Sequence, residues 1–500
     1  MAEQAIIELK GINKSFGGVH ALKNVDLTIN KGEIHALAGE NGSGKSTLIK
    51  VLCGVHQPDS GTIRINGEEC GKMTPLMAIK KGIQVIYQDF SVFPNLSVIE
   101  NIAFNSEIMR RSKVVSKKRM RETAQQAVDR IGFHVDLDEK VGNLCVADKQ
   151  LVAISRALLH DAKLIIMDEP TTALTRKEVD KLFEIIAMLK KEGIAILFVS
   201  HKTDEVFEIS ERYTILRSGE KIITGDVPEL KPDDFAYYMT GRHFTYDETA
   251  AALPGNTIFE ARGIGRKNEF QNVSFCLRKG EILCIAGLLG SGRTELAKAL
   301  FGIEPVEYGE LLMEGKPVHI QSVQDAMKNK IAYVPEDRLT EGLFLQQSIY
   351  YNEVIGNIRK YTGRLGALDQ KRMEADSMHW VQEMTVNTSD MHRMVSTLSG
   401  GNQQKVILGR WLATSPKVLI LNGPTVGVDI GAKFDIHKLL RKLAQSDMGI
   451  LIISDDIPEI FACSDRVLVM KNGVISDSFN TAEINEKTLA RAMFEEEVKA

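Results

Sequence analysis

Short runs of apolar residues recur along the chain, and small or polar residues follow each of them. Four lie in the first half, at residues 34–38 (IHALA), 83–87 (IQVIY), 164–167 (LIIM) and 194–199 (IAILFV). Runs of this length, bounded by turn residues, are typical of buried strands in a parallel sheet. The first run leads through a glycine-rich loop into the helical pattern TLIKVLCG (47–54). The pattern predicts an α/β fold, and no run is long enough to span a membrane.

The same pattern occurs a second time. KGEIHALAGENGSGKST (31–47) matches KGEILCIAGLLGSGRTE (279–295) at an offset of 248 residues. LIIMDEPTTALT (164–175) matches VLILNGPTVGVD (418–429) at an offset of 254. The second copy therefore gains six residues before position 398. We expect this insertion in surface loops or in a subdomain that tolerates extra residues.

The repeat defines the expected domains. Five hundred residues are too many for one hydrophobic core. We expect one domain at 1–244 and a second at 257–500. The segment 245–256, rich in small residues and containing Pro254, is the expected linker.

Composition narrows the class of protein. A net charge of −4 gives no global attraction to nucleic acid. The six cysteines show no CxxC spacing, which disfavours a zinc site or a disulfide framework and suits a reducing cytosol. The basic segment 110–121 carries seven Lys or Arg residues. It is interpreted as a solvated helix start or loop, with contact to lipid headgroups or a membrane partner as the alternative.

The first copy contains a phosphate-binding motif. Residues 39–46 read GENGSGKS, which is GxxxxGK[ST] between an apolar strand and a helix. Glycines let backbone N–H groups surround phosphates without a Cβ in the way, Lys45 would neutralise phosphate charge, and Ser46 would bind Mg²⁺. The residues expected around the ATP phosphates are Gly39, Glu40, Asn41, Gly42, Ser43, Gly44, Lys45, Ser46 and Thr47.

A second motif favours hydrolysis. The strand at 164–167 delivers Asp168 toward the metal and Glu169 toward the attacking water. Gln88 fits a residue that senses the metal or the water, and His201 fits one that reaches the γ-phosphate. Phe16 fits a ring that stacks on adenine. Taken singly, Gln88 and His201 are more often structural, and Phe16 is more often part of a core.

With these motifs in place, the chain resembles the ATP-binding subunits of ABC transporters over nearly its whole length. LSGGNQQKVILGRWL (398–412) looks like the ABC signature and its helix. YQDFSVFPNLSVIENI (87–102), EDRLTEGL (336–343) and GRTEL (292–296) resemble the sugar-import ATPases of the ribose, galactose and xylose type. The resemblance implies two tandem P-loop NTPase domains, each a RecA-like α/β core with a β-subdomain and an inserted helical subdomain.

The resemblance also implies that the two domains sandwich ATP head to tail. The first site would then combine the motifs of the first copy with the second copy's signature. The residues it would receive are Ser399, Gly400, Gly401, Asn402 and Asp429. Every group expected for hydrolysis is present there.

The second site would be degenerate. Its phosphate loop has Arg in place of Lys, its strand ends in Asn-Gly instead of Asp-Glu, and the facing signature reads LCVAD (144–148). Without a base and with one metal carboxylate missing, it is expected to hold nucleotide without hydrolysing it. The residues assigned to it are Gly287, Gly292, Arg293, Thr294, Glu336, Asn422, Gly423, Asp455 and Cys145.

The function that the resemblance implies is the Mg²⁺-dependent ATPase of a monosaccharide importer. It would lie at the cytoplasmic face of the cell membrane, bound to integral-membrane permease subunits and, through them, to an extracytoplasmic sugar-binding protein. A nucleoside or a signalling furanose is an alternative solute. A soluble ABC protein acting on ribosomes or nucleic acid fits less well, because those proteins tend to have a long charged linker and two intact sites. A regulator that binds ATP without hydrolysing it is the third alternative.

Overall fold

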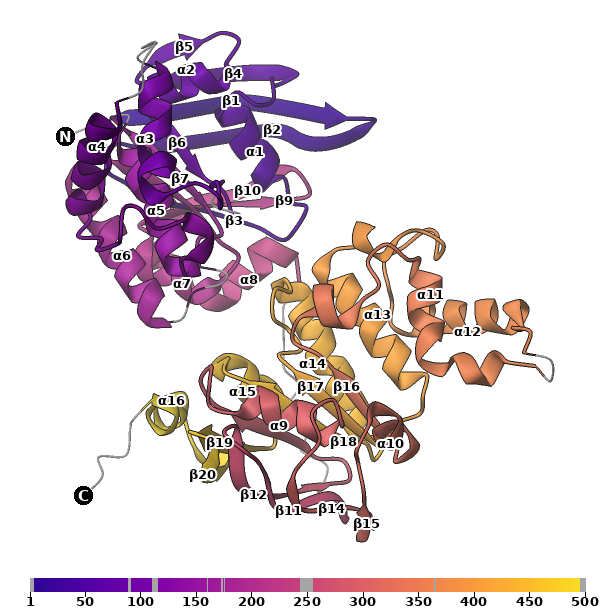
Figure 1. The fold of residues 1–500 in the computed structure, drawn as a ribbon. Helices are drawn as coiled ribbons and strands as arrows, with labels where there is room; N and C mark the ends of the chain where they lie inside the picture. The colour runs from indigo at the N-terminus through magenta and orange to yellow at the C-terminus, as the bar shows by residue number, and fades with distance from the viewer. Residues whose placement is uncertain are drawn as a thin grey trace, which may run out of the picture. The chain divides into compact units, whose positions relative to one another are not determined.

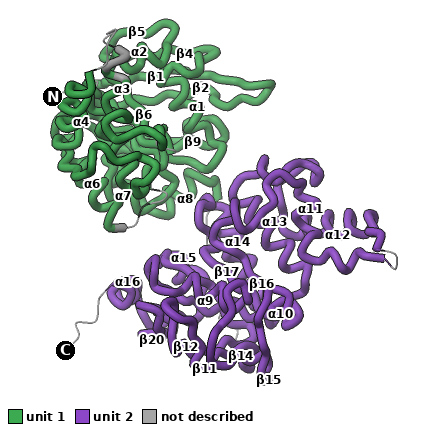
Figure 2. The backbone as a smooth tube through the Cα atoms, viewed as in Figure 1, with its two compact units in different colours: residues 1–244 green, residues 245–500 purple. Residues whose placement is uncertain are grey.

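The computed structural model describes residues 4–88, 91–109, 116–159, 161–171, 174, 176–242, 255–363 and 366–494. The chain forms two compact units, residues 1–244 and 245–500 (Figure 2). Most of the expected linker 245–256, and the first half of the basic segment 110–121, lie outside the described residues. The last two residues of that linker, Gly255 and Asn256, exchange backbone hydrogen bonds with Lys279 and so already belong to the fold of unit 2.

A six-stranded sheet forms the core of unit 1, in the strand order β10-β9-β3-β8-β7-β6 (Figure 1). All neighbours are parallel except the pair β10–β9. The strands are β3 Ile34–Ala38, β6 Ile83–Ile86, β7 Leu164–Asp168, β8 Ala195–Val199, β9 Arg212–Arg217 and β10 Glu220–Asp226. The four apolar runs of the first copy are therefore neighbouring strands, which confirms the predicted α/β core.

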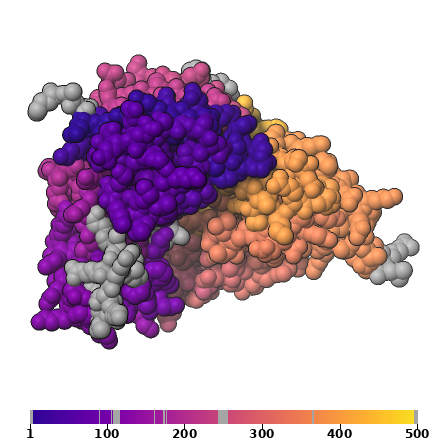
Figure 3. Space-filling model, turned by 90° about the horizontal axis from the view of Figure 1, so that it is seen from above, coloured from indigo at the N-terminus to yellow at the C-terminus, as the bar shows by residue number. Residues whose placement is uncertain are grey.

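A second, antiparallel sheet covers part of this core, in the order β2-β1-β4-β5. In the space-filling view its residues, coloured indigo, form an outer face of unit 1 (Figure 3). The strands are β1 Ala5–Phe16, β2 Val19–Asn30, β4 Ser60–Ile65 and β5 Glu68–Cys70. Buried residues of both sheets and of helix α1 (Lys45–Leu52) share one hydrophobic cluster, so the phosphate loop is anchored between the two sheets.

The helices of unit 1 form two groups. Those around the core sheet and at its ends are α1, α2 Pro75–Lys80, α6 Arg176–Lys191, α7 Thr203–Ile209 and α8 Pro232–Thr240. Those that form an inserted helical group between β6 and β7 are α3 Val98–Met109, α4 Lys117–Arg130 and α5 Val146–Leu158. The inserted helices pack against one another and share a core with α6. Unit 1 thus has the predicted α/β core, β-subdomain and helical subdomain.

Unit 2 repeats this architecture. Its core sheet has the order β16-β17-β18-β13-β19-β20, and its antiparallel sheet the order β12-β11-β14-β15. The strands are β11 Thr257–Arg266, β12 Phe270–Arg278, β13 Ile282–Ala286, β14 Tyr308–Met313, β15 Lys316–Val318, β16 Ile331–Val334, β17 Val418–Asn422, β18 Gly449–Ser454, β19 Arg466–Lys471 and β20 Val474–Asn480. The α-helices are α9 Arg293–Leu300, α10 Val323–Lys328, α11 Ile349–Val354, α12 Gln370–Glu383, α13 Gly400–Leu412, α14 Ile430–Ala444, α15 Ile457–Cys463 and α16 Glu486–Phe494.

The six extra residues of unit 2 are divided between the turn after β16 and the helical region that follows it. Asn101 of α3 and Asn352 of α11 make the same contacts, each accepting a hydrogen bond from the backbone N–H of a phenylalanine eight residues earlier. This pairing has an offset of 251, so three extra residues precede α11. They fall around a π-helical turn, Arg338–Gly342, which follows β16 (Ile331–Val334) after a short connection.

Candidate functional site

The phosphate loop of unit 1 has a conformation that requires glycine. Gly39 and Gly44 have positive φ angles of 153° and 107°. A Cβ on Gly39 would lie 2.3 Å from the carbonyl oxygen of Leu216, and one on Gly44 would lie 2.8 Å from that of Ala21. Lys45 is 6% exposed and donates hydrogen bonds to the carbonyl oxygens of Gly39 (2.6 Å) and Glu40 (2.9 Å). The lysine ammonium is therefore held across the loop.

Strand β7 brings the two carboxylates of unit 1 to the same edge of the sheet. The pKa of Asp168 is raised by burial and by the charge of Glu169, and the cations Lys45 and Lys50 oppose the shift. Asp168 thus lies within electrostatic range of the phosphate loop. Glu169 Oε1 lies 3.0 Å from Nδ1 of His201, which follows β8. The structure brings these predicted residues together.

Glu169 has an unusual backbone. Its φ is +47°, in the left-handed region that non-glycine residues rarely adopt. Its N–H donates to the carbonyl oxygen of Val199 at 2.9 Å, which fixes this conformation. The equivalent Gly423 of unit 2 has φ +55° and an N–H that donates to Ile453 at 2.8 Å. Because the left-handed conformation costs a residue with a Cβ about 1–2 kcal/mol, Glu169 is held at this place against its backbone preference.

Phe16 and Gln88 are both on the surface of unit 1. Phe16 is 43% exposed, so it is not a core residue. Its ring meets the His56 ring edge to face at 5.0 Å, and Lys14 Nζ lies 5.4 Å from its centre. Gln88 is exposed in the turn after β6. The shorter hairpin β11–β12 of unit 2 ends at Arg266 and Phe270.

The intact signature of unit 2 begins helix α13. Ser399 is its N-cap and is exposed, and its Oγ accepts a hydrogen bond from Asn402 at 2.9 Å. A Cβ on Gly401 would lie 2.4 Å from the Cβ of Ala432. Asp429 caps the neighbouring helix α14, accepting from the N–H of Ala432 at 2.8 Å. Gly401 is thus required by the close packing of two helix N-termini.

In unit 1 the corresponding position is Cys145. It is the N-cap of α5, and its sulfur accepts a hydrogen bond from the N–H of Asp148 at 3.4 Å. The helix start is therefore retained, while Val146 and Ala147 carry side chains where unit 2 has glycines.

The phosphate loop of unit 2 keeps its shape but changes its cation. Gly290 and Gly292 have φ angles of 82° and 94°, close to the 82° and 107° of Gly42 and Gly44 in the first loop. A Cβ on Gly287 would lie 2.6 Å from a backbone oxygen, so this position also requires glycine. Arg293 is 5% exposed and forms an ion pair of 3.1 Å with Asp455, the residue at the His201 position. Asp455 is therefore paired with the cation of the phosphate loop, whereas His201 is paired with Glu169.

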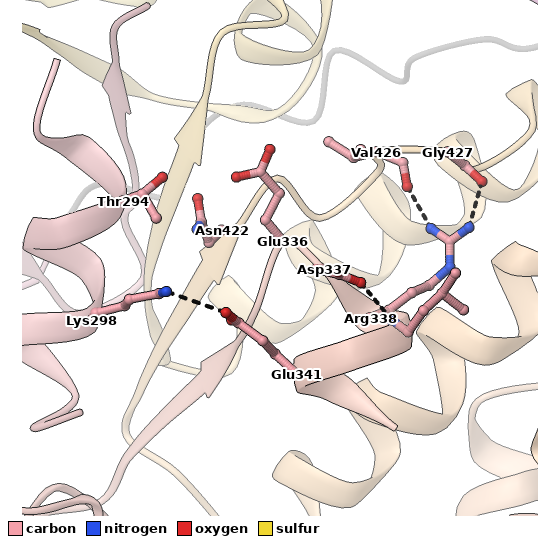
Figure 4. A pocket seen from close by; sticks show the side chains of 10 residues that line it. Thr294, Lys298, Glu336, Asp337, Arg338, Glu341, Asn422, Val426 and Gly427 are labelled. Carbon is pink, nitrogen blue, oxygen red and sulfur yellow. Dashed lines mark hydrogen bonds and ion pairs between the residues drawn. The ribbon is translucent and has the colours of Figure 1, made fainter. Parts of the chain in front are cut away.

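A cavity of about 390 Å³ adjoins this loop. Glu336, Asn422 and Thr294 line it together (Figure 4). A Cβ on Gly423 would lie 3.1 Å from Cγ of Glu336 and 2.9 Å from Cγ2 of Val426. Burial raises the pKa of Glu336; the charge of Arg293 lowers it, and nearby carboxylates raise it further. Of the residues predicted for the second site, Thr294, Glu336 and Asn422 thus lie around one cavity of unit 2, whereas Cys145 belongs to unit 1.

Two contacts were not anticipated from the sequence. Arg338 donates to the carbonyl oxygens of Val426 (2.5 Å) and Gly427 (2.9 Å), which ties the turn after β16 to the segment before Asp429. In each unit a glutamate accepts a hydrogen bond from a serine at the end of a core strand: Glu205 from Ser200, which follows β8, and Glu459 from Ser454, the last residue of β18. Glu205 and Glu459 occupy equivalent positions in the repeat, so a comparison of the two copies could have pointed to these glutamates.

The donor set of unit 1 suits Mg²⁺. Among the described residues, no group of three or more His, Cys, Asp or Glu side chains is placed to hold a metal ion. Mg²⁺ bound with a nucleotide needs few protein ligands, usually one or two carboxylates in addition to phosphate oxygens. Ser46, Gln88 and Asp168 supply a hydroxyl, an amide and a carboxylate. These residues therefore fit the metal.

Comparison with known proteins decides the family. The profile described as "ABC transporter" matches residues 22–172 and 270–426. The chain belongs to the ABC transporter family. Both matched segments contain a phosphate loop and the strand that follows the helical group, so each unit is one ABC ATPase domain.

Relatives of this ABC ATPase align with it almost end to end. The ribose import ATP-binding protein RbsA of Clostridium perfringens is 41% identical over 97% of this chain and 97% of its own. The galactose/methyl galactoside import ATP-binding protein MglA of Shigella boydii is 40% identical over 97% and 96%. The solved ATP-binding cassette MJ1267, in its ADP conformation, is 25% identical over 48% of this chain and 99% of its own, with a TM-score of 0.43. No described helix is long and apolar enough to cross a membrane.

Proposed function

We propose that this chain is the ATP-hydrolysing subunit of an importer for a monosaccharide, a pentose or hexose, and that it has one hydrolytic and one degenerate ATP site. The observation that carries the proposal is Glu169, held in a left-handed conformation beside His201 and Asp168 in unit 1. Unit 2 has Gly423 in the same backbone conformation and so has no base. The names and near-complete alignment of the relatives support sugar import.

The residues of unit 1 divide the chemistry among them. Glu169 orients the attacking water and accepts its proton, and His201 holds Glu169 and reaches the γ-phosphate. Lys45 and the loop N–H groups bind the phosphates, and Phe16 packs on the adenine. Ser46, Gln88 and Asp168 would hold Mg²⁺, which when bound neutralises charge on the phosphates.

The first site is completed by unit 2 in this proposal. Ser399, Gly400 and Gly401 would present the N-terminus of α13 to the γ-phosphate, with Asn402 fixing Ser399 and Asp429 beside them. Arg338 would hold the segment before Asp429 in place through its two backbone contacts. We propose that residues 1–244 and 257–500 form the two domains and that 245–256 joins them, with the last two residues of this linker hydrogen-bonded to Lys279 of the second domain.

The partners follow from this role. We propose that the chain lies at the cytoplasmic face of the cell membrane and binds the permease subunits through the region of residues 91–102. A sugar-binding protein on the other side of the membrane would deliver the solute to the permease. The import names of the relatives support these partners.

The assembled complex provides the test. The chain, its permease and its binding protein are reconstituted in lipid vesicles, and phosphate release is measured with ribose, xylose, galactose or a nucleoside. Stimulation by one pentose or hexose is expected. Stimulation by nucleosides alone, or equal ATPase activity with and without every sugar tested, would contradict sugar import.

Restoring the two carboxylates of unit 2 is not expected to create a second hydrolytic site. In the variant Asn422→Asp/Gly423→Glu, the new Cβ at 423 meets Val426 at 2.9 Å and Glu336 at 3.1 Å, in a left-handed conformation. Asp455 remains paired with Arg293. ATP turnover should stay at the parent level, as measured by phosphate release. A doubled rate that survives Glu169→Gln would refute this prediction.

A further inference from the structure

We propose that unit 2 binds Mg²⁺ together with its nucleotide, and that Glu336 provides the carboxylate ligand that Asp168 provides in unit 1. The inference rests on the proposed function, in which the degenerate site holds nucleotide. It assigns a set of metal ligands to that site although β17 ends in Asn422 instead of a carboxylate.

The two units carry the same three donor groups in a different order. Unit 1 has the hydroxyl of Ser46 on α1, the amide of Gln88 after β6 and the carboxylate of Asp168 on β7. The counterparts in unit 2 are, in the same order, Thr294 on α9, Glu336 after β16 and Asn422 on β17. The carboxylate stands on β7 in unit 1 but after β16 in unit 2, and the amide has changed place in the opposite direction. Each unit therefore has one negative charge and one hydroxyl, one amide and one carboxylate among these three groups.

The unit 2 donors converge on one space. Thr294, Glu336 and Asn422 all line the cavity of about 390 Å³, and Figure 4 shows the Glu336 carboxyl group turned toward the side where Thr294 and Asn422 lie. Gly423, the residue after Asn422, lies so close to Glu336 that a Cβ there would meet its Cγ at 3.1 Å. Because residue 423 is a glycine, the Glu336 side chain can occupy the space beside it.

Glu336 differs from the other carboxylates of the cavity. Asp337 accepts hydrogen bonds from the N–H of Leu339 and from Thr340, so it caps the π-helical turn. Glu341 forms an ion pair of 3.2 Å with Lys298. Glu336 has no hydrogen bond or ion pair with any residue that the structure describes. It is therefore the carboxylate available to a cation.

An anion is expected beside that cation. The Arg293 side chain is buried, with only 5% of its surface exposed. Its Nε and Nη1 atoms have no hydrogen-bond partner among the described residues. The buried Ser291 hydroxyl in the same loop also has none. Buried donors without partners are costly unless a ligand pairs with them. Phosphate oxygens in this loop would satisfy them and would provide the remaining metal ligands.

The test measures nucleotide affinity with and without the metal. The full chain carries Lys45→Ala and Asp168→Ala to remove binding at the first site, and mant-ATP is titrated in Mg²⁺ and in EDTA. We expect tighter binding in Mg²⁺. We call the ratio of the mant-ATP affinity in Mg²⁺ to that in EDTA the Mg²⁺ advantage. Even substitutions of residues behind the ligands cost about 10–100-fold in metal affinity, so Glu336→Gln should lower this ratio by at least about tenfold. The affinity in EDTA should be no weaker.

Two variants control for charge and for folding. Glu341→Gln makes the same charge change in the same cavity and should keep the Mg²⁺ advantage. Glu336→Gln/Asn422→Asp recreates the donor order of unit 1 and should restore it. Equal affinity in Mg²⁺ and EDTA, or equal losses in Glu336→Gln and Glu341→Gln, would overturn the inference alone. Absence of mant-ATP binding in both conditions would overturn it together with the proposed retention of nucleotide.

Discussion

Glu169→Gln is expected to lower steady-state ATP hydrolysis by about 10²–10⁴-fold, the usual contribution of a general base. Glutamine has nearly the same shape, so its contacts and its left-handed backbone are expected to stay in place, but its amide does not accept the proton of the attacking water. ATP binding should be retained, because the phosphate loop and Asp168 are unchanged. Phosphate release measures the first effect and mant-ATP titration the second.

Glu169→Gly separates catalysis from folding. This variant copies the residue found at Gly423, which adopts nearly the same φ without a Cβ. It should be as inactive as Glu169→Gln and at least as stable to heat as the parent chain. Hydrolysis that persists in both variants would show that the catalytic base lies elsewhere, and the assignment of the first site would fail.

Ser399→Arg is expected to abolish most ATP hydrolysis, although it lies in the unit that has Gly423 at the position of Glu169. Ser399 is exposed at the N-terminus of α13, where an arginine places a bulky cation over the helix start. If this helix meets the γ-phosphate bound by unit 1, the arginine blocks closure of the working site. Phosphate release by the full chain measures the loss.

Cys145→Arg is the matched control for Ser399→Arg. Cys145 is the N-cap at the same position of the repeat and is also exposed. It would face the degenerate site, so the same substitution should cost much less activity. Equal losses in both variants, or full activity in Ser399→Arg, would refute a head-to-tail arrangement in which unit 2 completes the hydrolytic site.

Much of the fold could be predicted from the sequence, because its signals are local and occur twice. The buried strands of the core sheet are continuous apolar runs, and the glycines of the phosphate loops stand at fixed spacing. The repeat also makes Arg293 the counterpart of Lys45 and Gly423 the counterpart of Glu169, which the two offsets give directly. The insertion was also expected in a tolerant region, and it lies in the helical region and the turn before it.

The sequence did not reveal contacts that depend on side-chain direction. Glu336 was expected only as a substitute for glutamine, and its approach to Gly423 needs the three-dimensional position of the turn after β16. Arg338 stands 88 residues from Val426, whose carbonyl oxygen it binds. The left-handed backbone of Glu169 was hidden as well, because nothing in the letters DEP distinguishes a strained residue from a relaxed one.

That strain gives the two units unequal evolutionary freedom. A chain that keeps Glu169 accepts an unfavourable backbone for the sake of chemistry, whereas a change to glycine at the same place relaxes the fold. In a unit that does not need a base, a change to glycine at this position would meet little resistance from folding stability. The return path is uphill, since a side chain regained at Gly423 meets the strain and also the neighbours Val426 and Glu336. Division of labour between the units, once begun, is thereby made hard to reverse.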